Sequence, residues 1–130
     1  MLVVGLLACG GGVAAAQPSS AHTQDSLDVV KAAVAQQKAV LVDVREPDEW
    51  QQGHVAGARL VPLSTLERGV NADELARTIP KGTVIYPYCM VGGRSVASAK
   101  FFRALGYDVR PLKPGYPELA RAGFPTATGK

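Results

Sequence analysis

The sequence has few of the residue types and charge clusters that often indicate a protein's function. It contains two cysteines, two histidines and one tryptophan, and no run of like charges. A nucleic-acid-binding surface needs clustered basic residues with interleaved aromatics, whereas the aromatic content here is 6% and the net charge is +3. No nucleic-acid partner is therefore expected. His22 and His54 are too isolated from other potential ligands to predict a metal site, and no cofactor motif accompanies them.

Internal repeats, coiled-coil heptads and phosphate-binding glycine motifs are also missing, which excludes those classes of protein. What is present is an ordinary globular composition, 47% hydrophobic and 19% charged, in 130 residues. This length accommodates one modest domain, which we place at residues 26–125. The mild positive charge suits the approach of small anions. The oligomeric state stays open.

Long hydrophobic runs are absent apart from an uncharged segment at the N-terminus. Residues 1–16 are rich in Leu, Val, Ala and Gly and end in small residues, a pattern typical of a signal peptide cleaved after Ala16. The segment is too short to span a bilayer. It predicts export to the periplasm or otherwise out of the cytoplasm, with residues 17–25 as a flexible lead-in to the domain.

A second interpretation of the leader remains open. Leu6-Leu7-Ala8-Cys9 is similar to the lipobox of bacterial lipoproteins, which would make residues 1–8 the leader and Cys9 a lipid-anchored first residue. The protein is expected to bind a membrane only if Cys9 is lipidated. In either case Cys89 is the thiol of the domain, and a single cysteine in an exported domain suggests a free, reactive thiol.

Apolar and polar segments alternate in a way that predicts an α/β fold. Strands are expected at residues 40–44, 58–61, 83–86 and 109–112, and helices at 26–34, 47–52, 71–78, 95–105 and 117–122. Such alternation indicates a mainly parallel sheet with helices on both faces. Ligands of these sheets bind beyond the carboxyl ends of the strands, which is where Cys89 falls.

The segment after the third strand carries the chemistry. Cys89 opens a glycine-bearing loop, and a helical pattern follows, so backbone N–H groups and the positive helix end should surround the sulfur. These groups favour a thiolate, the nucleophilic form of cysteine. The alternative is a buried structural cysteine, since free cysteines are commonly buried. The predicted substrate-binding loop is Met90, Val91, Gly92, Gly93, Arg94 and Ser95.

Two motifs in this order resemble the rhodanese-like sulfurtransferases. The first is Cys89-x-x-Gly92-x-Arg94-Ser95, which looks like the active-site loop of that family. The second is the segment 41–50, LVDVREPDEW, followed by the segment 53–58, GHVAGA. The resemblance runs from about residue 26 to residue 123 and implies a single rhodanese-like domain.

The resemblance implies sulfur transfer through a Cys89 persulfide. The partners would be a small anionic sulfur donor such as thiosulfate and a thiol or cyanide acceptor, with no metal or cofactor. Arg94 would supply charge for the donor, and Lys113 is a possible second cation at the same mouth. Asp43 and Arg45 would form a structural polar network under the loop, because a charge on a buried strand is costly unless it is paired.

Two other functions remain as alternatives. One is a non-catalytic persulfide carrier or rhodanese-like binding module. The other is a phosphatase or arsenate reductase, which is disfavoured because related phosphatases have a Cys-x5-Arg loop and this chain has Cys-x4-Arg. The chain also departs from the family at Pro87, which we expect to end its strand early and shift the loop, and at Pro114, which replaces a glycine.

Overall fold

The computed structural model describes residues 21–130, so the predicted leader, its cleavage site and Cys9 lie outside the described residues. Within them the helices are α1 (Leu27–Ala35), α2 (Pro47–Gln52), α3 (Leu63–Arg68), α4 (Ala72–Thr78), α5 (Gly93–Ala104) and α6 (Tyr116–Arg121). The strands are β1 (Ala39–Asp43), β2 (His54–Val55), β3 (Arg59–Leu60), β4 (Val84–Tyr88), β5 (Asp108–Val109) and β6 (Thr126–Ala127). No helix among the described residues is long and apolar enough to cross a bilayer.

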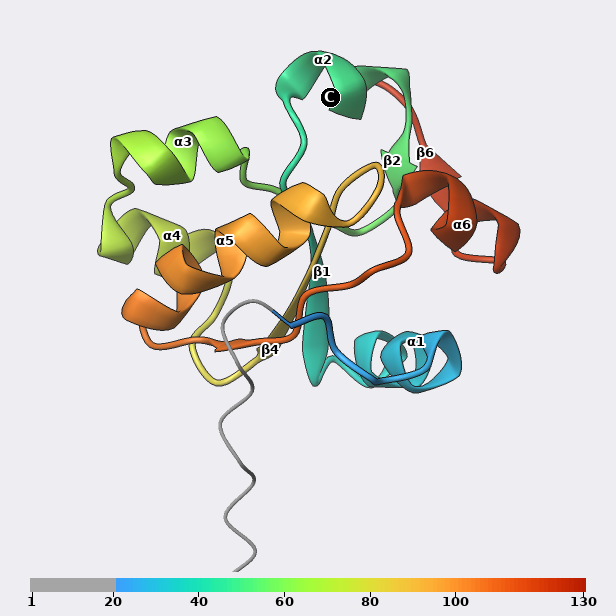
Figure 1. Ribbon diagram of the computed structural model, residues 1–130, viewed down its shortest axis with the longest axis horizontal. Coiled ribbons are helices and arrows are strands. Elements are labelled where there is room, and N and C mark those ends of the chain that lie inside the picture. The colour runs from blue at the N-terminus through green and yellow to red at the C-terminus, as the bar shows by residue number, and fades with distance from the viewer. Residues whose placement is uncertain (1–20) are drawn as a thin grey trace, which may run out of the picture.

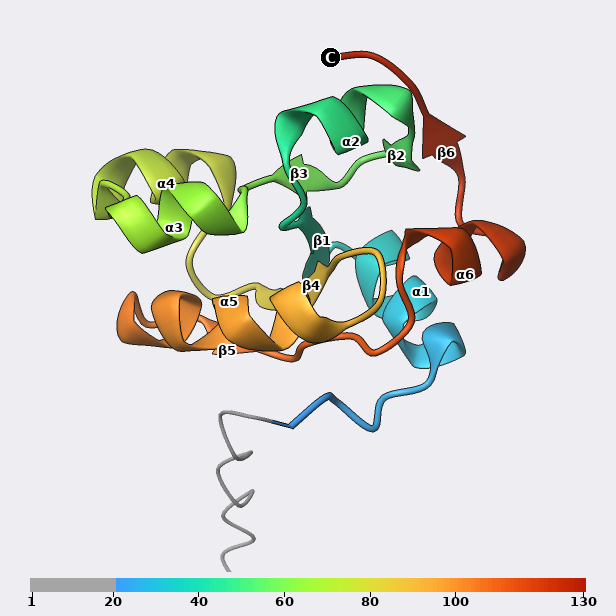
Figure 2. The ribbon, with the colours of Figure 1, turned by 45° about the horizontal axis from the view of Figure 1, so that its top comes forward.

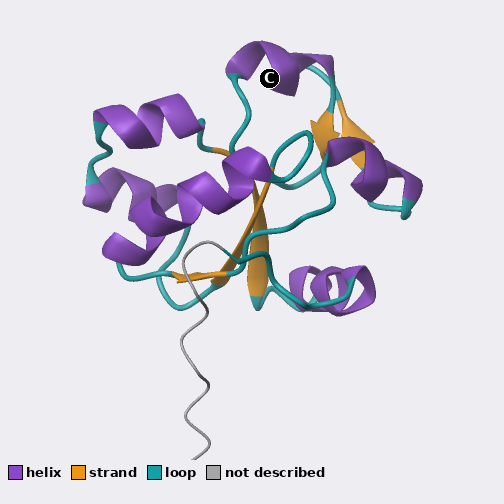
Figure 3. Ribbon diagram, viewed as in Figure 1, coloured by secondary structure: helices purple, strands orange, loops and turns teal. Residues whose placement is uncertain are grey.

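Four strands form a parallel sheet in the order β3-β1-β4-β5, and the helices cover both of its faces. Helices α3, α4 and α5 lie on one side, and α1 and α6 lie on the other (Figures 1 and 2). Figure 3 shows the two central strands, β1 and β4, running through the middle of the molecule between these helices. The predicted α/β class, with a parallel sheet flanked on both faces, is confirmed.

The central strands bury both faces, which explains their nearly continuous apolar sequence. On β1, Val42 packs into the cluster beneath α3, α4 and α5, while Leu41 packs into the cluster beneath α1 and α6. On β4, Ile85 and Tyr86 divide in the same way. The period-two alternation of a strand thus builds two separate cores from one sheet.

Pro87 does not end its strand, and that expectation was wrong. β4 continues to Tyr88, and Pro87 pairs with Val42 of β1. The carbonyl of Pro87 accepts from the Leu112 N–H (2.9 Å). The proline nitrogen therefore faces the segment after β5, which has already left the sheet at Val109. The missing N–H therefore affects only this side of the strand. The bonds to β1 are made by neighbouring residues, as where the Tyr88 carbonyl accepts from the Val44 N–H (3.0 Å), so proline is tolerated much as it is on an edge.

Other differences from the predicted elements arise where distant segments meet. Helix α3 and the antiparallel pair β2–β6 were not predicted, and β6 lies beyond residue 125, where the domain was expected to end. The fourth predicted strand is shorter than expected and is paired only over Asp108–Val109. Each of these elements has only two or six residues, too few for a periodic pattern to appear in the sequence.

The segment before α1 is held against the domain at its described end, residues 22–25, which we call the N-terminal strap. The Thr23 N–H donates to the Pro111 carbonyl (2.8 Å). The Asp25 carboxylate accepts from the Tyr86 hydroxyl (2.6 Å) and from Arg110 Nη1 (3.0 Å). The expected flexible lead-in over 17–25 is therefore replaced, at these residues, by a segment fixed through side chains of β4 and of the chain after β5.

Candidate active site

The loop that follows β4 places Cys89 at the carboxyl end of the central strand and at the start of α5. β4 ends at Tyr88, and α5 begins at Gly93 with Gly92 as its N-cap. Cys89 is 1% exposed and packs against the cluster beneath α3, α4 and α5. The strand, loop and helix therefore follow one another in the predicted order, and the sulfur lies at the positive end of a three-turn helix.

Gly92 supplies the hydrogen bond to the sulfur. Its N–H donates to Cys89 Sγ at 3.0 Å. Gly92 has φ of +93°, in the left-handed region that side chains disfavour. A Cβ built there would lie 2.9 Å from the Lys113 carbonyl oxygen and 3.0 Å from His22 Nε2. Glycine is thus required at this position both for the backbone angle and for the space.

The carbonyl of Gly92 is bonded as well as its N–H. Ser95 Oγ donates to it at 2.8 Å and also lies 2.7 Å from the Leu112 carbonyl, so the buried Ser95 joins the loop to the segment after β5. His22 Nε2 lies 2.8 Å from the same Gly92 oxygen. Val91 of the same loop is 83% exposed, in contrast to the buried Cys89 and Ser95.

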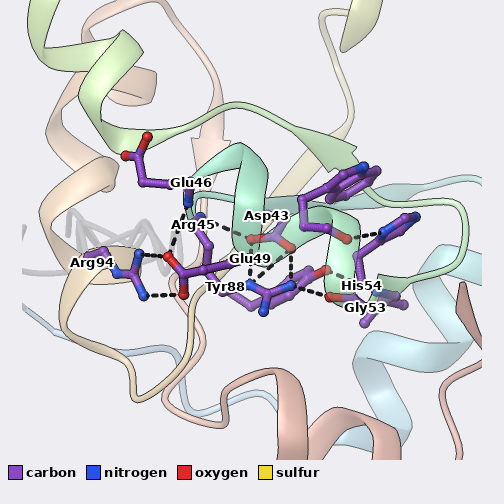
Figure 4. Close-up of polar contacts among 10 residues, drawn as sticks. Asp43, Arg45, Glu46, Glu49, Gly53, His54, Tyr88 and Arg94 are labelled. Carbon is purple, nitrogen blue, oxygen red and sulfur yellow. Dashed lines mark hydrogen bonds and ion pairs between the residues drawn. The ribbon is translucent and has the colours of Figure 1, made fainter. Parts of the chain in front are cut away.

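Arg94 does not project freely into solvent but pairs with α2. Its Nη1 and Nη2 donate to Glu49 Oε1 (2.7 Å) and Oε2 (3.0 Å), a two-bond fork drawn in Figure 4. About a third of each side chain remains exposed. This hydrogen bonding lowers the pKa of Glu49 and raises the pKa of Arg94. The sequence reasoning assigned Glu49 no role, although the residue lies within the motif that carried the resemblance.

Asp43 and Arg45 form a buried ion pair beside the loop. Arg45 Nη2 donates to Asp43 Oδ2 at 2.7 Å, and the arginine is 1% exposed (Figure 4). The same Nη2 donates to the Gly53 carbonyl at 2.7 Å. Burial by itself would lower the pKa of Arg45, but the Asp43 carboxylate holds it above its ordinary value. Pairing and hydrogen bonding therefore satisfy both charges, as burial requires.

The chain after β5 closes against the loop at Gly115. A Cβ on Gly115 would lie only 1.8 Å from the Met90 carbonyl oxygen, so glycine permits this close approach. The next residue, Tyr116, donates its N–H to the Cys89 carbonyl (2.8 Å). Pro114, the departure from the family pattern, precedes this contact without displacing it. Lys113 is exposed, and its backbone lies next to Gly92.

A pocket of about 230 Å³ opens beside the loop. Its lining comes from four segments and combines charged, amide, thioether and phenol groups: Arg45, Glu49, Gln52, Gly53, Met90 and Tyr116. Met90 joins this pocket to the cysteine loop. The lining is mixed in charge, which suits a small polar molecule more than a bulky apolar one.

The two histidines serve backbone contacts. His54 Nδ1 lies 2.8 Å from the Trp50 carbonyl, and the two rings stack with centroids 3.5 Å apart. His22 contacts the Gly92 carbonyl. Among the described residues, no three potential ligands gather in a way that could hold a metal ion. The role of His22 beside the loop had no signal in the sequence, since 70 positions separate it from Gly92.

These features match a known family. The model of the rhodanese-like domain matches residues 26–122. The chain belongs to the rhodanese-like family. This membership confirms the resemblance that the two motifs indicated. It covers the segment from the start of α1 to the end of α6, including the loop that bears Cys89.

Several relatives of this rhodanese-like domain are sulfurtransferases by name. Thiosulfate sulfurtransferase 16, chloroplastic, of Arabidopsis thaliana is 30% identical in an alignment of 94 positions that covers 65% of this chain and 77% of that protein. The uncharacterized protein YqhL of Bacillus subtilis is 40% identical over 80 residues. The human single-domain sulfurtransferase TSTD1 superposes with a TM-score of 0.65 at 25% identity, covering 75% of this chain and 94% of that one.

The shared region is only part of several of these relatives. The chain spans 59% of YqhL, and 17% of the probable adenylyltransferase/sulfurtransferase MoeZ of Mycobacterium tuberculosis, to which it is 32% identical over 71 residues. The comparisons therefore establish a rhodanese-like domain with sulfurtransferase relatives.

Proposed function

We propose that this rhodanese-like domain is a sulfurtransferase that carries sulfane sulfur as a Cys89 persulfide, with thiosulfate or a similar anion as donor. The observation that carries the proposal is the Gly92 N–H, which donates to Cys89 Sγ at 3.0 Å inside a loop at the start of α5. An N–H donor and the positive end of a helix stabilise an anionic sulfur, whether thiolate or persulfide.

The reaction divides into two displacements. In the first, the Cys89 thiolate attacks the outer sulfur of thiosulfate, the sulfur–sulfur bond breaks, and sulfite leaves with the electron pair. In the second, a thiol or cyanide attacks the terminal sulfur of the persulfide, and the Cys89 thiolate leaves. Covalent catalysis of this kind replaces one difficult transfer with two easier ones. The Gly92 N–H serves the same sulfur in both steps.

Arg94 contributes in a restrained way. Its guanidinium is held by both oxygens of Glu49, so its position relative to the loop is set by α2. Its positive charge is therefore held in a fixed position at the start of α5, close enough to Cys89 to interact with it electrostatically. The pocket lined by Arg45, Gln52 and Met90 lies beside this pair and is our candidate for the acceptor side of the site.

The test is uptake and release of one sulfur atom. After incubation with thiosulfate, intact-mass analysis should show one added sulfur on the wild-type protein and none on Cys89→Ser, because a hydroxyl does not hold a persulfide. Cyanide should then remove the sulfur as thiocyanate, with steady release of sulfite. Thermal unfolding of Cys89→Ser, matched to the wild type, would exclude loss of the fold as the cause.

Three results distinguish the alternatives. Sulfur uptake without turnover would identify a persulfide carrier. Turnover that survives in Cys89→Ser would refute the covalent mechanism. Hydrolysis of p-nitrophenyl phosphate through Cys89, faster than turnover of thiosulfate, would favour the phosphatase. We expect negligible hydrolysis, because the Cys-x4-Arg loop leaves too little room for a phosphoryl group with three equatorial oxygens.

A further inference from the structure

Gly92 holds the nucleophile with one backbone group and is itself held by the other. Its N–H donates to Cys89 Sγ, and its carbonyl accepts from Ser95 Oγ and lies 2.8 Å from His22 Nε2. Since a carbonyl oxygen only accepts, the His22 nitrogen at this contact must carry the proton. The N–H lies in the peptide plane shared with Val91 and the carbonyl in the plane shared with Gly93, and the φ and ψ angles of Gly92 join the two planes. A restraint on the carbonyl therefore limits these angles, and through them the direction of the N–H.

A restraint is needed because Gly92 is conformationally free. With φ of +93° and no side chain, the residue has access to several backbone wells of similar energy. Ser95 restrains the carbonyl from the first turn of the same helix, and its hydroxyl also lies 2.7 Å from the Leu112 carbonyl. His22 restrains it from a segment 70 residues away in sequence. An external anchor of this kind resists rotation of the loop as a whole.

The strap that carries His22 is well fixed. Thr23 donates its N–H to the Pro111 carbonyl, and Asp25 accepts from the Tyr86 hydroxyl and Arg110. Tyr86 belongs to β4, the strand that leads into the cysteine loop. These contacts fix the His22 imidazole relative to β4, the strand that also positions Cys89. The distance from His22 Nε2 to the Gly92 oxygen is thus set by contacts independent of the loop.

We propose that His22 is a positioning residue for sulfur transfer, acting through the backbone angles of Gly92 to keep its N–H directed at the Cys89 sulfur. The proposal rests on the function proposed above, although its structural part does not require it. The hydrogen bond of His22 is to the Gly92 carbonyl, so its effect on the sulfur is indirect. Its effect is to keep the anion-stabilising N–H in place before the reaction begins, so that no reorganisation is needed during it.

The experiment compares His22→Ala with His22→Gln. The side-chain amide of glutamine supplies an N–H donor near the position of Nε2, whereas alanine supplies none. The first readout is hydrogen exchange of the Gly92 amide measured by NMR, with the Ala99 amide in α5 as the internal reference. We expect exchange at Gly92 to be about fivefold faster in His22→Ala, the equivalent of one neutral hydrogen bond, and close to wild type in His22→Gln.

The second readout is the single-turnover rate of persulfide formation from thiosulfate, which should fall about fivefold in His22→Ala and recover in His22→Gln. Ser26→Ala is the matched control. It removes the N-cap of α1, where Ser26 Oγ accepts from the Val29 N–H at 3.2 Å, and so destabilises the same end of the domain without touching the loop.

Each outcome decides the proposal. Unchanged Gly92 exchange in His22→Ala, a His22→Gln protein as slow as His22→Ala, or an equal loss in Ser26→Ala would overturn it. If the wild-type protein takes up no sulfur, the proposed function fails, but the hydrogen-exchange comparison still decides whether His22 positions Gly92.

Discussion

At the scale of single residues, two glycines make the site possible for different physical reasons. Gly92 adopts a left-handed backbone angle, whereas Gly115 has an ordinary extended one and is needed for space. At Gly115 a side chain would collide with the Met90 carbonyl. Because this carbonyl is part of the backbone, the collision is not relieved by the rotation of a flexible side chain. Close packing of this kind between two loops positions the carbonyl of Cys89 against Tyr116.

Gly115→Ala should therefore be strongly destabilising. The added Cβ would overlap the Met90 carbonyl oxygen at 1.8 Å, so the loop or the chain after β5 must move. We expect the free energy of unfolding to fall by about 3 kcal/mol, the upper end of the range for overpacking. Urea denaturation measures this change.

Gly93→Ala provides the matched control for that measurement. Gly93 is the first residue of α5, directly after the cysteine loop; its backbone angle is not left-handed, and a Cβ there meets nothing within 4 Å. Because alanine favours a helix more than glycine does, we expect stability to be unchanged or to rise by less than about 1 kcal/mol. Equal losses in the two alanine variants would refute the argument from close approach.

At the scale of elements, α2 and α5 are coupled by the pair of Glu49 and Arg94. The two residues are 45 positions apart, and the fork between them ties α2, which begins in the segment 41–50, to the start of α5, directly after the cysteine loop. The pair is partly exposed, so its contribution to folding stability should be small. Its effect should appear mainly in the position of the guanidinium beside the sulfur.

A double-mutant cycle of Arg94→Lys and Glu49→Gln tests this coupling. Lysine makes no two-bond fork with a carboxylate, and glutamine offers only one acceptor oxygen. We expect each variant to lower kcat/KM for thiosulfate, and the double variant to lose about fivefold less than the product of the single losses, a coupling of about 1 kcal/mol.

Stability is the control for the cycle. The free energy of unfolding should change by less than about 1 kcal/mol in either single variant, as is usual for a partly exposed pair. Losses of kcat/KM that multiply independently would show that Arg94 acts without its partner.

At the scale of the whole molecule, the hydrogen bonds of the N-terminal strap and of the loop link stability to pH. Hydrogen bonds from Tyr86 to Asp25 and from Arg94 to Glu49 lower the pKa of these carboxyls below their ordinary values of 3.8 and 4.5. A carboxylate with a lowered pKa stabilises the fold above its ordinary value and loses that contribution as pH falls. Burial raises the pKa of Tyr86 to about 12, so its contribution is lost as pH rises from 10.0 to about 12.

The free energy of unfolding should therefore fall on both sides of a neutral plateau, below about pH 4.5 and above about pH 10. Urea denaturation across this range measures it. Asp25→Asn should flatten part of the acid limb, because the amide does not titrate, and Tyr86→Phe should reduce the alkaline limb. The exposed Glu67 offers a control, and Glu67→Gln should leave the acid limb as in the wild type. An unfolding free energy as large at pH 3 as at pH 7 would contradict the linkage.

Part of the site could be predicted from the sequence because it depends on local order. Strand, cysteine loop and helix are contiguous, so apolar runs and glycines predicted them without knowledge of the rest of the fold. The pairing of Asp43 with Arg45 was also accessible, since two charges in one buried segment must satisfy each other. The fold class followed from the alternation of strands and helices.

Contacts between distant segments were decided only by the tertiary structure. Glu49 meets Arg94, His22 meets Gly92 and β2 meets β6 only because the fold brings together segments that are far apart in the sequence. Pro87 led to the wrong expectation that its strand ends early. Whether a strand tolerates proline depends on which neighbouring strand the missing N–H faces, and here that neighbour, β5, ends at Val109. The sequence by itself determined the order of strand, cysteine loop and helix on which the chemistry proposed for Cys89 rests, since a local pattern of residue types is enough to specify that order. The partners that hold that chemistry in place depend on packing across the sheet, which no local pattern encodes.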